Sequence, residues 1–347
     1  PLTWSSFSPT LVEFGIGALD KVGALATPFG QTACLVGSES SRRTGAFERC
    51  RASLQEAGIT VTEHHVAITA DPTVHQANEL GRSLKSLCSD MVVAIGGGSV
   101  LDCAKAAAVL AVQGGLAEEH LSGEAGPATA SLSVVAVPTT AGTGAELSKG
   151  AILTWPERKL KGGMRGEALL PDVAVVDPLL TVTVSPMQTL YTGFDAFAHA
   201  VETYISRRST PITELFSSAA VTGVVANLPR VIAAPDDLAA RSELSLHAML
   251  MGYNLANSST CLPHRLQYAV GAATGTAHGL GLAALFPSWI RTTRAASPDR
   301  FANVAGWIGE GLGRSFADIE EAVASFMERI GLRPSLQDLG VTEDDLP

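Results

Sequence analysis

Short apolar runs alternate with amphipathic stretches along the first half of the chain. Apolar runs bounded by turn residues predict strands at residues 32–37, 91–95 and 133–137, and the more polar stretch 60–66 is predicted as a further strand. Apolar residues at helical spacing between these runs predict helices at about 45–57, 75–85 and 100–112. Strands and helices in alternation imply a parallel sheet with helices on both of its faces.

The pattern changes after the apolar run at residues 173–176. Ser185-Pro186 is a strong helix start, with the Ser as N-cap and the Pro in the first helical position. From there onward the sequence shows helical patterns interrupted by Gly and Pro, without a convincing strand. The predicted fold is therefore an α/β, Rossmann-like N-terminal domain with a parallel sheet (residues 1–180) and an all-α C-terminal domain (residues 181–347).

The composition of the chain argues against a nucleic-acid-binding, a disulfide-rich and a membrane-spanning protein. The 347 residues carry a formal net charge of −10, which argues against a nucleic-acid surface. Five widely spaced cysteines without a C-x-x-C pair predict no disulfide framework and favour a reducing, cytoplasmic compartment. The longest apolar stretch, residues 91–112, contains Asp102, Lys105 and three consecutive glycines, so it is not expected to span a membrane. The first residues show no signal-peptide pattern, and we expect neither a membrane nor a nucleic-acid partner.

A glycine turn, Gly96-Gly97-Gly98-Ser99, follows the strand predicted at 91–95. Such glycines let the backbone approach a pyrophosphate closely, and the next helix offers free N–H groups at its positive end. The turn is not G-x-G-x-x-G, so an ordinary βα turn explains it as well as a nucleotide site does. Asp102 and Lys105, on the helix that follows, are either contacts of a bound cofactor or solvent-facing residues.

A second loop, at residues 137–146, also follows a predicted strand and carries Thr139, Thr140 and Thr143. Two loops at the carboxyl ends of parallel strands flank the crevice in which α/β sheets bind their ligands. The pair of loops therefore favours a nucleotide site more than either loop does alone.

Asp195 and His199 lie four residues apart and so share one face of a helix. His264 and His278 follow, separated by Gly271 and Gly275, which predicts that they belong to two different elements. One carboxylate and three imidazoles form a plausible set of ligands for a divalent transition metal. The alternative is that Asp195 forms a salt bridge or faces solvent, and that each histidine is an ordinary core or surface residue.

Five segments in this order resemble the group III, or iron-containing, alcohol dehydrogenases, which include the maleylacetate reductases: GGGSVLDCAK, PTTAGTGAE, LLPDVAVVDP, GFDAFAHAVE and HGLGLAALFP. The segment VEFGIG at residues 12–17 is similar to the opening strand and turn of that family, and the resemblance runs from about residue 10 to 340. It implies a Rossmann-like domain and a helical domain that bind NAD(P)H and a divalent metal, Fe²⁺ or Zn²⁺. We expect a homodimer that acts on a small-molecule substrate.

The resemblance also assigns roles to individual residues. It places the metal on Asp195, His199, His264 and His278. It places the cofactor pyrophosphate on Gly97, Gly98 and Ser99, with further cofactor contacts from Thr139, Thr140 and Thr143. Asp102 joins this group as a candidate cofactor residue. Relatives continue past the equivalent of Asp345-Leu346-Pro347, so we expect the natural chain to extend further.

Two positions depart from the family pattern. Many members carry a further histidine where Tyr268 stands here, and a phenol with an ordinary pKa of about 10 shuttles protons poorly at neutral pH. NAD-preferring members carry an Asp where Ser38 stands, and Arg42 and Arg43 follow it. Losing that carboxylate removes repulsion of a 2′-phosphate, and a nearby Arg could bind one, so we expect NADPH to be used at least comparably to NADH.

The predicted function is an NAD(P)H-dependent, metal-assisted reductase or dehydrogenase. It would interconvert a small polar or anionic aldehyde or oxo acid with its alcohol, as an aldehyde reductase or a maleylacetate reductase-like enzyme does. His264, Tyr268 and Lys161 are the candidate catalytic residues, and Arg165 and Arg265 are either further anchors for a negative charge or solvent-facing residues. The alternatives are an NAD- and metal-dependent cyclase or lyase of the dehydroquinate synthase-like superfamily and a catalytically silent binding protein.

Overall fold

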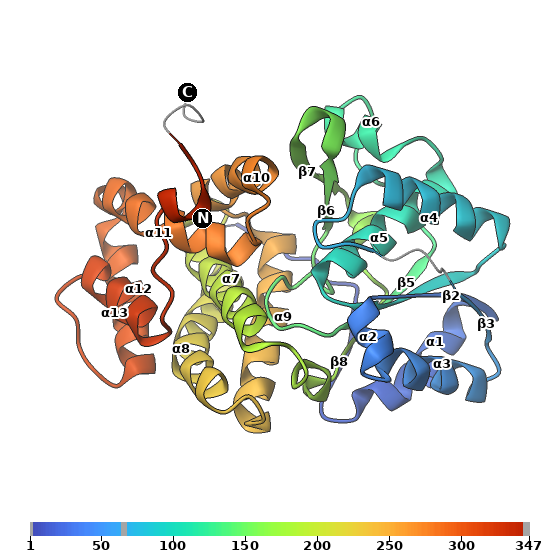
Figure 1. Ribbon diagram of the computed structural model, residues 1–347, viewed down its shortest axis with the longest axis horizontal. Coiled ribbons are helices and arrows are strands. Elements are labelled where there is room, and N and C mark those ends of the chain that lie inside the picture. The colour runs from blue at the N-terminus through green and yellow to red at the C-terminus, as the bar shows by residue number, and fades with distance from the viewer. Residues whose placement is uncertain (1–2, 64–67, 343–347) are drawn as a thin grey trace. The chain divides into compact units, whose positions relative to one another are not determined.

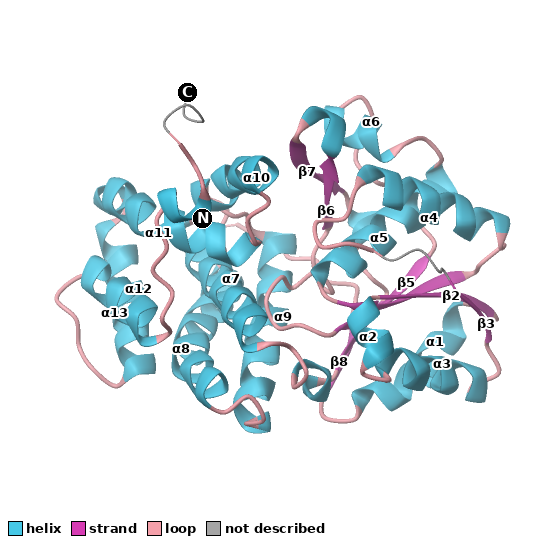
Figure 2. Ribbon diagram, in the orientation of Figure 1, coloured by secondary structure: helices cyan, strands magenta, loops and turns pink. Residues whose placement is uncertain are grey.

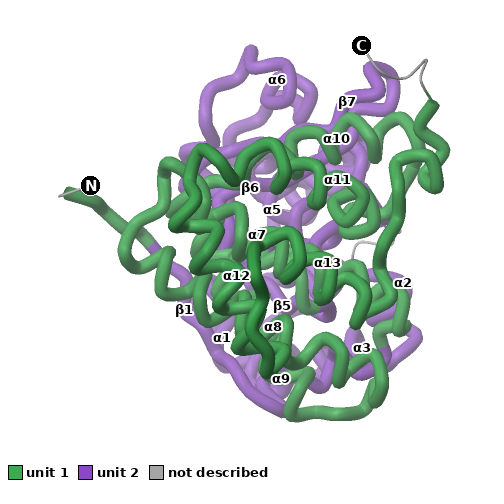
Figure 3. The backbone as a smooth tube through the Cα atoms, turned by 90° about the vertical axis from the view of Figure 1, so that its left-hand side faces the viewer, with its two compact units in different colours: residues 1–7, 141–144, 184–347 green, residues 8–140, 145–183 purple. Residues whose placement is uncertain are grey.

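The computed structural model describes residues 3–63 and 68–342 of the chain (Figure 1). The chain divides into two compact units. An α/β unit takes residues 8–140 and 145–183, and a helical unit takes residues 1–7, 141–144 and 184–347 (Figure 3). The helical unit is thus assembled from three pieces of the chain, one of which is the short segment 141–144 from the second predicted cofactor loop.

A six-stranded sheet forms the α/β unit (Figure 2). Its strands are β1 (Leu11–Phe14), β2 (Thr32–Gly37), β3 (Thr60–Glu63), β4 (Met91–Gly96), β5 (Ser133–Pro138) and β8 (Val173–Val176). They lie in the order β1-β8-β5-β4-β2-β3, and every neighbouring pair is parallel. The predicted parallel sheet is confirmed.

Helices cover both faces of this sheet. They are α1 (Val22–Ala26), α2 (Glu39–Arg43), α3 (Ala46–Glu56), α4 (Val74–Ser86), α5 (Gly98–Gln113) and α6 (Ala117–Ser122). Successive residues of a strand point to opposite faces. On β2, Cys34 and Val36 join a core formed with α4 and α5, while Ala33 and Leu35 join a second core formed with α1 and α3. Burial on both faces explains why these strands are continuous apolar runs in the sequence.

Most predicted elements of this unit are confirmed with small shifts of their ends. The strand predicted at 60–66 is observed as β3, and residues 64–66 lie outside the described part of the chain. The short helices α1, α2 and α6 were not predicted, nor was an antiparallel hairpin of β6 (Gly150–Trp155) and β7 (Leu160–Arg165). Gly162 and Gly163 hide β7 because glycine is uncommon in strands. The alternation of buried Ala151 and Leu153 was the signal available for β6.

The order of the strands locates the ligand-binding edge of the sheet. The chain runs from β2 outward to β3 and then returns to β4 on the other side of β2. At such a reversal the loops after the two central strands diverge and leave a crevice for a ligand. The residues at this point are Ser38, directly after β2, and Gly96-Gly97, at the end of β4.

Seven helices build the helical unit, and the described residues from 184 to 342 contain no strand. They are α7 (Pro186–Ile205), α8 (Pro211–Ala233), α9 (Leu238–Asn257), α10 (Leu262–Thr274), α11 (His278–Thr293), α12 (Pro298–Leu312) and α13 (Ile319–Arg329). The predicted helix start is confirmed, because the Ser185 side chain accepts a hydrogen bond from the Gln188 N–H. Aromatic rings from three helices form the centre of the core: Phe194, Phe197, Phe286 and Phe326.

Among the described residues, α8 is the one helix long and apolar enough to cross a membrane by length and composition alone. In the structure it packs against α7, α9 and α12. Its residues Val221, Val224 and Leu228 are fully buried in the core. This packing accounts for the apolar composition of the helix.

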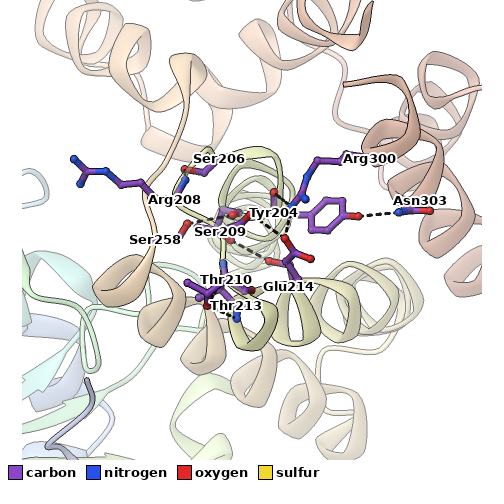
Figure 4. A network of polar contacts seen from close by, with 12 residues as sticks. Tyr204, Ser206, Arg208, Ser209, Thr210, Thr213, Glu214, Ser258, Arg300 and Asn303 are labelled. Carbon is purple, nitrogen blue, oxygen red and sulfur yellow. Dashed lines mark hydrogen bonds and ion pairs between the residues drawn. The ribbon is translucent and has the colours of Figure 1, made fainter. Parts of the chain in front are cut away.

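A polar network fixes the end of α7 (Figure 4). The Arg300 guanidinium lies 3.9 Å over the Tyr204 ring and donates to Ser209 Oγ and Glu214 Oε1 at 3.0 and 2.8 Å. Asn303 donates to the Tyr204 hydroxyl at 2.8 Å. Since Tyr204 is on α7, Glu214 on α8 and Arg300 on α12, the network joins three helices. It holds the helix that carries the first two predicted metal ligands.

Candidate active site

Three helices of the helical unit bring the four predicted metal ligands together. Asp195 and His199 lie one turn apart on α7, His264 lies on the first turn of α10, and His278 is the first residue of α11. The prediction that the last two histidines belong to separate elements is confirmed. Gly279 allows α11 to approach α7 closely, because a Cβ at this position would lie 2.0 Å from the Tyr191 carbonyl oxygen.

One carboxylate oxygen is the centre of the cluster. Asp195 Oδ1 lies 3.5 Å from His199 Nδ1, 3.4 Å from His264 Nε2 and 3.5 Å from His278 Nε2. The side chains of Asp195, His199 and His264 are almost fully buried, and about a quarter of the His278 side chain is exposed. The cluster is therefore closed on most sides and accessible at His278.

The cluster fits a divalent metal ion. Ligand atoms bound tetrahedrally at about 2.0–2.2 Å lie about 3.3–3.6 Å apart, and the three separations from Asp195 Oδ1 fall in this range. The ligand atoms of Asp195, His199 and His264 all lie within 4.8 Å of one another, and His278 joins them through its separation from Asp195. Asp195 Oδ1, His199 Nδ1 and His264 Nε2 are buried and have no hydrogen-bond partner among the described residues. Unpartnered buried polar atoms are costly, and a shared cation would satisfy all three at once.

The electrostatics of the cluster favour a cation as well. Burial alone would raise the pKa of Asp195, but the surrounding imidazoles hold it below its ordinary value. Burial lowers the pKa of His199 to about 4, so this imidazole is neutral at pH 7. Burial also opposes a charge on His264, yet Glu202 and Asp195 on its two sides raise its pKa to about 9. Metal ligands must be deprotonated, so a bound dication takes the place of the proton that His264 otherwise holds.

Each imidazole also forms a hydrogen bond with a group outside the cluster, and the sequence alone did not predict these partners. Glu202 Oε1 lies 2.5 Å from His264 Nδ1, and Gln267 Oε1 accepts a hydrogen bond from His278 Nδ1. The backbone of Gly142 accepts a hydrogen bond from His199. Such outer partners orient the rings and fix which nitrogen is available to a metal. The signal in the sequence was Glu202 itself, a charged residue in an apolar helix, seven residues after Asp195.

Tyr268 lies on the same face of α10 as His264, one turn further along. Its ring is stacked with the His278 ring, with centroids 6.2 Å apart and an interplanar angle of 28°. The structure therefore places Tyr268 beside the accessible side of the cluster, as expected for a residue that contacts substrate. Arg265 is exposed on the same helix, and Arg165 is exposed on β7.

The glycine turn of the α/β unit has the geometry of an anion site. Gly97 is the N-cap of α5 without a side-chain cap, and Gly98 and Ser99 begin the helix. The first N–H groups of a sixteen-residue helix are thus available to a phosphate. The Thr139 N–H donates to the Gly96 carbonyl at 2.9 Å, so the two predicted cofactor loops are joined at their bases.

Four other candidate residues of the α/β unit are already engaged. Ser99 Oγ accepts a hydrogen bond from the Asp71 N–H, and the ammonium of Lys161 forms an ion pair with Asp71 at 2.5 Å. Ser38 is the N-cap of α2 and accepts a hydrogen bond from the Ser41 N–H. Asp102 Oδ2 accepts from the Ile152 N–H at 3.0 Å. Their contacts with substrate or cofactor stay predictions.

The interpretation of Asp102 and Lys105 as solvent-facing residues is wrong. The Lys105 side chain is fully buried and pairs with Asp102 at 3.1 Å. Its ammonium donates to the carbonyls of Ala145 and Gly150 at 2.9 and 2.5 Å. A buried ammonium is tolerated when it is paired and hydrogen-bonded in this way. Lys105 therefore fixes the chain that follows the second cofactor loop.

The remaining cofactor candidates fall into two groups. Thr140 lies beside the glycine turn, since a Cβ on Gly97 would be 3.4 Å from Thr140 Oγ1. Thr143 belongs to the short segment that packs with the helical unit. Near Ser38, Arg42 pairs with Glu63 at 3.2 Å and stacks on Phe47, whereas Arg43 is exposed.

An α/β unit with a nucleotide-type edge and a helical unit with a carboxylate–imidazole cluster are typical of a metal- and nucleotide-dependent oxidoreductase. Comparison with known proteins agrees. Residues 9–178 match the family model "Iron-containing alcohol dehydrogenase", and residues 189–347 match "Fe-containing alcohol dehydrogenase family, C-terminal". The chain belongs to the iron-containing alcohol dehydrogenase family, and it is an oxidoreductase that acts on CH–OH groups.

Individual relatives cover almost the whole chain. The chain is 31% identical over 346 residues to an NAD-dependent methanol dehydrogenase of Bacillus methanolicus, covering 98% of this chain and 90% of the relative. It is 32% identical over 352 residues to a 1,3-propanediol dehydrogenase of Citrobacter freundii, covering 98% and 89%. A sulfoacetaldehyde reductase of Bifidobacterium kashiwanohense, solved in complex with NAD⁺, superposes with a TM-score of 0.88 at 26% identity, covering 99% and 90%. The predicted family and fold are confirmed.

The metal cluster predicts the behaviour of two substitutions. His264→Ala and His278→Ala each remove one metal ligand. Loss of a group that only orients a ligand lowers metal affinity up to about 100-fold, so loss of a ligand itself should lower it by more. Elemental analysis after anaerobic reconstitution with Fe²⁺ or Zn²⁺ measures this, with one ion per chain expected for the parent. His247→Ala is the matched control, because it removes a buried imidazole of the same unit that is not part of the cluster. Parent-like metal content in either ligand variant would show that the site is misassigned.

The glycine turn predicts that two neighbouring substitutions differ in effect. A Cβ on Gly97 meets only ordinary contacts at 3.4 Å and beyond, so Gly97→Ala should fold with parent-like stability. It should nevertheless weaken NADH binding about 10-fold, because the methyl group occupies the side on which a pyrophosphate approaches. A Cβ on Gly96 would lie 2.6 Å from Val100, so Gly96→Ala should lower the melting temperature instead. Unchanged NADH affinity in folded Gly97→Ala, measured by fluorescence titration, would refute the placement.

Proposed function

We propose that this protein interconverts a small polar alcohol and its aldehyde, using NAD(P)H and one divalent metal held by Asp195, His199, His264 and His278. The observation that carries the proposal is the cluster of three imidazole nitrogens within 3.5 Å of Asp195 Oδ1, buried in one unit of an alcohol dehydrogenase fold. A divalent metal bound there supplies a Lewis acid that polarises the oxygen of the substrate. A bound nicotinamide supplies or accepts the hydride.

The residues of the chain have three tasks in this reaction. The N–H groups at the start of α5 bind the cofactor pyrophosphate, and the glycines at the turn keep that approach open. Burial of Asp195, His199 and His264 excludes water from all but the His278 side of the cluster. Tyr268, stacked on His278, orients the substrate with its hydroxyl. A phenol suits this task better than proton transfer at neutral pH.

The proposed substrate is a small aldehyde, either neutral or anionic. Methanol and 1,3-propanediol in the names of two relatives support a small substrate, and sulfoacetaldehyde in the name of a third supports an anionic one. Within the chain, the anchors predicted for a negative charge give less support. Lys161 is neutralised by Asp71, and Arg165 and Arg265 are exposed. The chain therefore gives less support to an oxo acid such as maleylacetate as the substrate than to a small aldehyde.

Further properties stay predictions of the sequence. They are the choice between Fe²⁺ and Zn²⁺, the use of NADPH, a homodimer and a cytoplasmic location. Of the two arginines near Ser38, Arg42 is held by Glu63 and Phe47, so Arg43 is the proposed partner of a 2′-phosphate. The dehydroquinate synthase-like alternative has no support, since the three relatives named above are two dehydrogenases and a reductase.

An assay of NADH and NADPH oxidation tests the proposed function. The reconstituted protein is offered propanal, 3-hydroxypropanal, sulfoacetaldehyde and glyoxylate, and cofactor absorbance is followed. We expect net, metal-dependent consumption of cofactor with at least one aldehyde. We also expect kcat/KM with NADH to exceed kcat/KM with NADPH by less than about 100-fold, or roughly 2.7 kcal/mol. Reaction of a cyclic substrate without net cofactor consumption would support the cyclase class instead. A larger preference for NADH would overturn only the role of Ser38 and Arg43.

Tyr268→Phe tests whether the hydroxyl binds substrate. The change keeps the ring stacked on His278 and removes one hydrogen bond, which contributes about 0.5–1.5 kcal/mol. We expect KM to rise about 3- to 10-fold, with a smaller decrease of kcat. Steady-state kinetics over a range of pH provide the measurement. A fall of kcat by about 100-fold or more with unchanged KM and a shifted pH profile would show that Tyr268 transfers a proton.

A further inference from the structure

Glu202 is a buried carboxylate on the face of α7 that carries the metal ligands. It lies seven residues after Asp195 and three after His199, spacings that share one side of a helix. Its side chain has no exposed surface. Among the described residues of the helical unit, Asp195 and Glu202 are the two buried acidic side chains. A buried charge is costly unless it is paired, so the position of this second carboxylate needs a physical reason.

The two oxygens of Glu202 both face hydrogen-bond donors. Oε1 lies 2.5 Å from His264 Nδ1, and Oε2 accepts from the Cys261 N–H at 2.6 Å. An ionised carboxylate accepts at both oxygens, whereas an amide has one acceptor and must direct its NH₂ group at the other donor. Glu202 therefore keeps the proton of His264 on Nδ1. Nε2, which lies 3.4 Å from Asp195 Oδ1, is then the nitrogen that would bind a metal ion.

The other two imidazoles are held by neutral acceptors. Gln267 Oε1 accepts from His278, and the backbone of Gly142 accepts from His199. Glu202 is thus the charged group among the three outer partners. A divalent ion bound by Asp195 and three neutral imidazoles would leave a net charge of +1 in a buried site. The charge of Glu202, on the far side of the His264 ring, balances it.

We propose that Glu202 is the positioning residue that sets the metal affinity of this centre, by fixing the orientation of His264 and by balancing the charge of the bound ion. The inference rests on the proposed metal centre and goes beyond its four ligands. A purely structural role is the competing explanation, because the contact with the Cys261 N–H also holds the first turn of α10. The two explanations differ in what Glu202→Gln changes.

Titration of the metal-free protein with Zn²⁺, in competition with a chromophoric chelator, separates the two explanations. Glu202→Gln is nearly isosteric, keeps one acceptor and loses the charge. We expect its Zn²⁺ affinity to fall about 10- to 100-fold, the usual range for loss of an outer partner. Glu328→Gln is the matched control, since it makes the same chemical change at an exposed position of α13 and should bind Zn²⁺ as the parent does. The absorption bands of Co²⁺-loaded protein should also change in Glu202→Gln and not in Glu328→Gln.

Denaturant unfolding, measured with and without Zn²⁺, separates a loss of metal affinity from a loss of stability in the variant. A ligand that binds only the folded state raises the free energy of unfolding in proportion to the logarithm of its concentration over Kd. The increase on adding Zn²⁺, compared within each protein, reports affinity even for a destabilised variant. A purely structural role would lower stability equally with and without Zn²⁺, and Zn²⁺ affinity within about 3-fold of the parent would overturn the proposal. A parent that binds no metal would overturn the proposed function as well.

Discussion

The arrangement of the candidate metal ligands depends on one buried carboxylate oxygen. Asp195 Oδ1 has three imidazole nitrogens within 3.5 Å and no hydrogen-bond partner among the described residues. A buried acceptor in that state is costly, and a divalent cation would satisfy the oxygen and the nitrogens together. The packing of α7, α10 and α11 can be understood as the means by which these four side chains are held at metal-binding distance.

Several independent contacts enforce that distance. Gly279 brings the start of α11 against α7, and the network of Tyr204, Glu214 and Arg300 fixes the end of α7. Within the unit, Asn254 donates to Thr203 Oγ1 at 3.2 Å, and that hydroxyl donates to the His199 carbonyl at 2.7 Å. Because these contacts come from different helices, the fold itself holds the four side chains close together.

The sequence predicted much of this arrangement, because part of it is local. The central strands β2, β4 and β5 are buried on both faces and therefore appear as apolar runs. Asp195 and His199 are one helical turn apart. Contacts made at long sequence separation could not be predicted in the same way. Lys105 was weighed as solvent-facing because its acceptors, the carbonyls of Ala145 and Gly150, lie more than a helix away in sequence. Glu202 was missed for the same reason, since its partner His264 comes from another helix.

One carboxylate and three imidazoles are proposed to bind a divalent metal in this chain. X-ray absorption spectroscopy of the Zn²⁺-loaded protein tests it most directly, because it identifies the atoms around the metal. We expect nitrogen and oxygen neighbours at about 2.0–2.2 Å from the metal, with the more distant scattering signature of about three imidazole rings. A sulfur scatterer at about 2.3 Å, as Cys261 would give, or the absence of the imidazole signature, would contradict it.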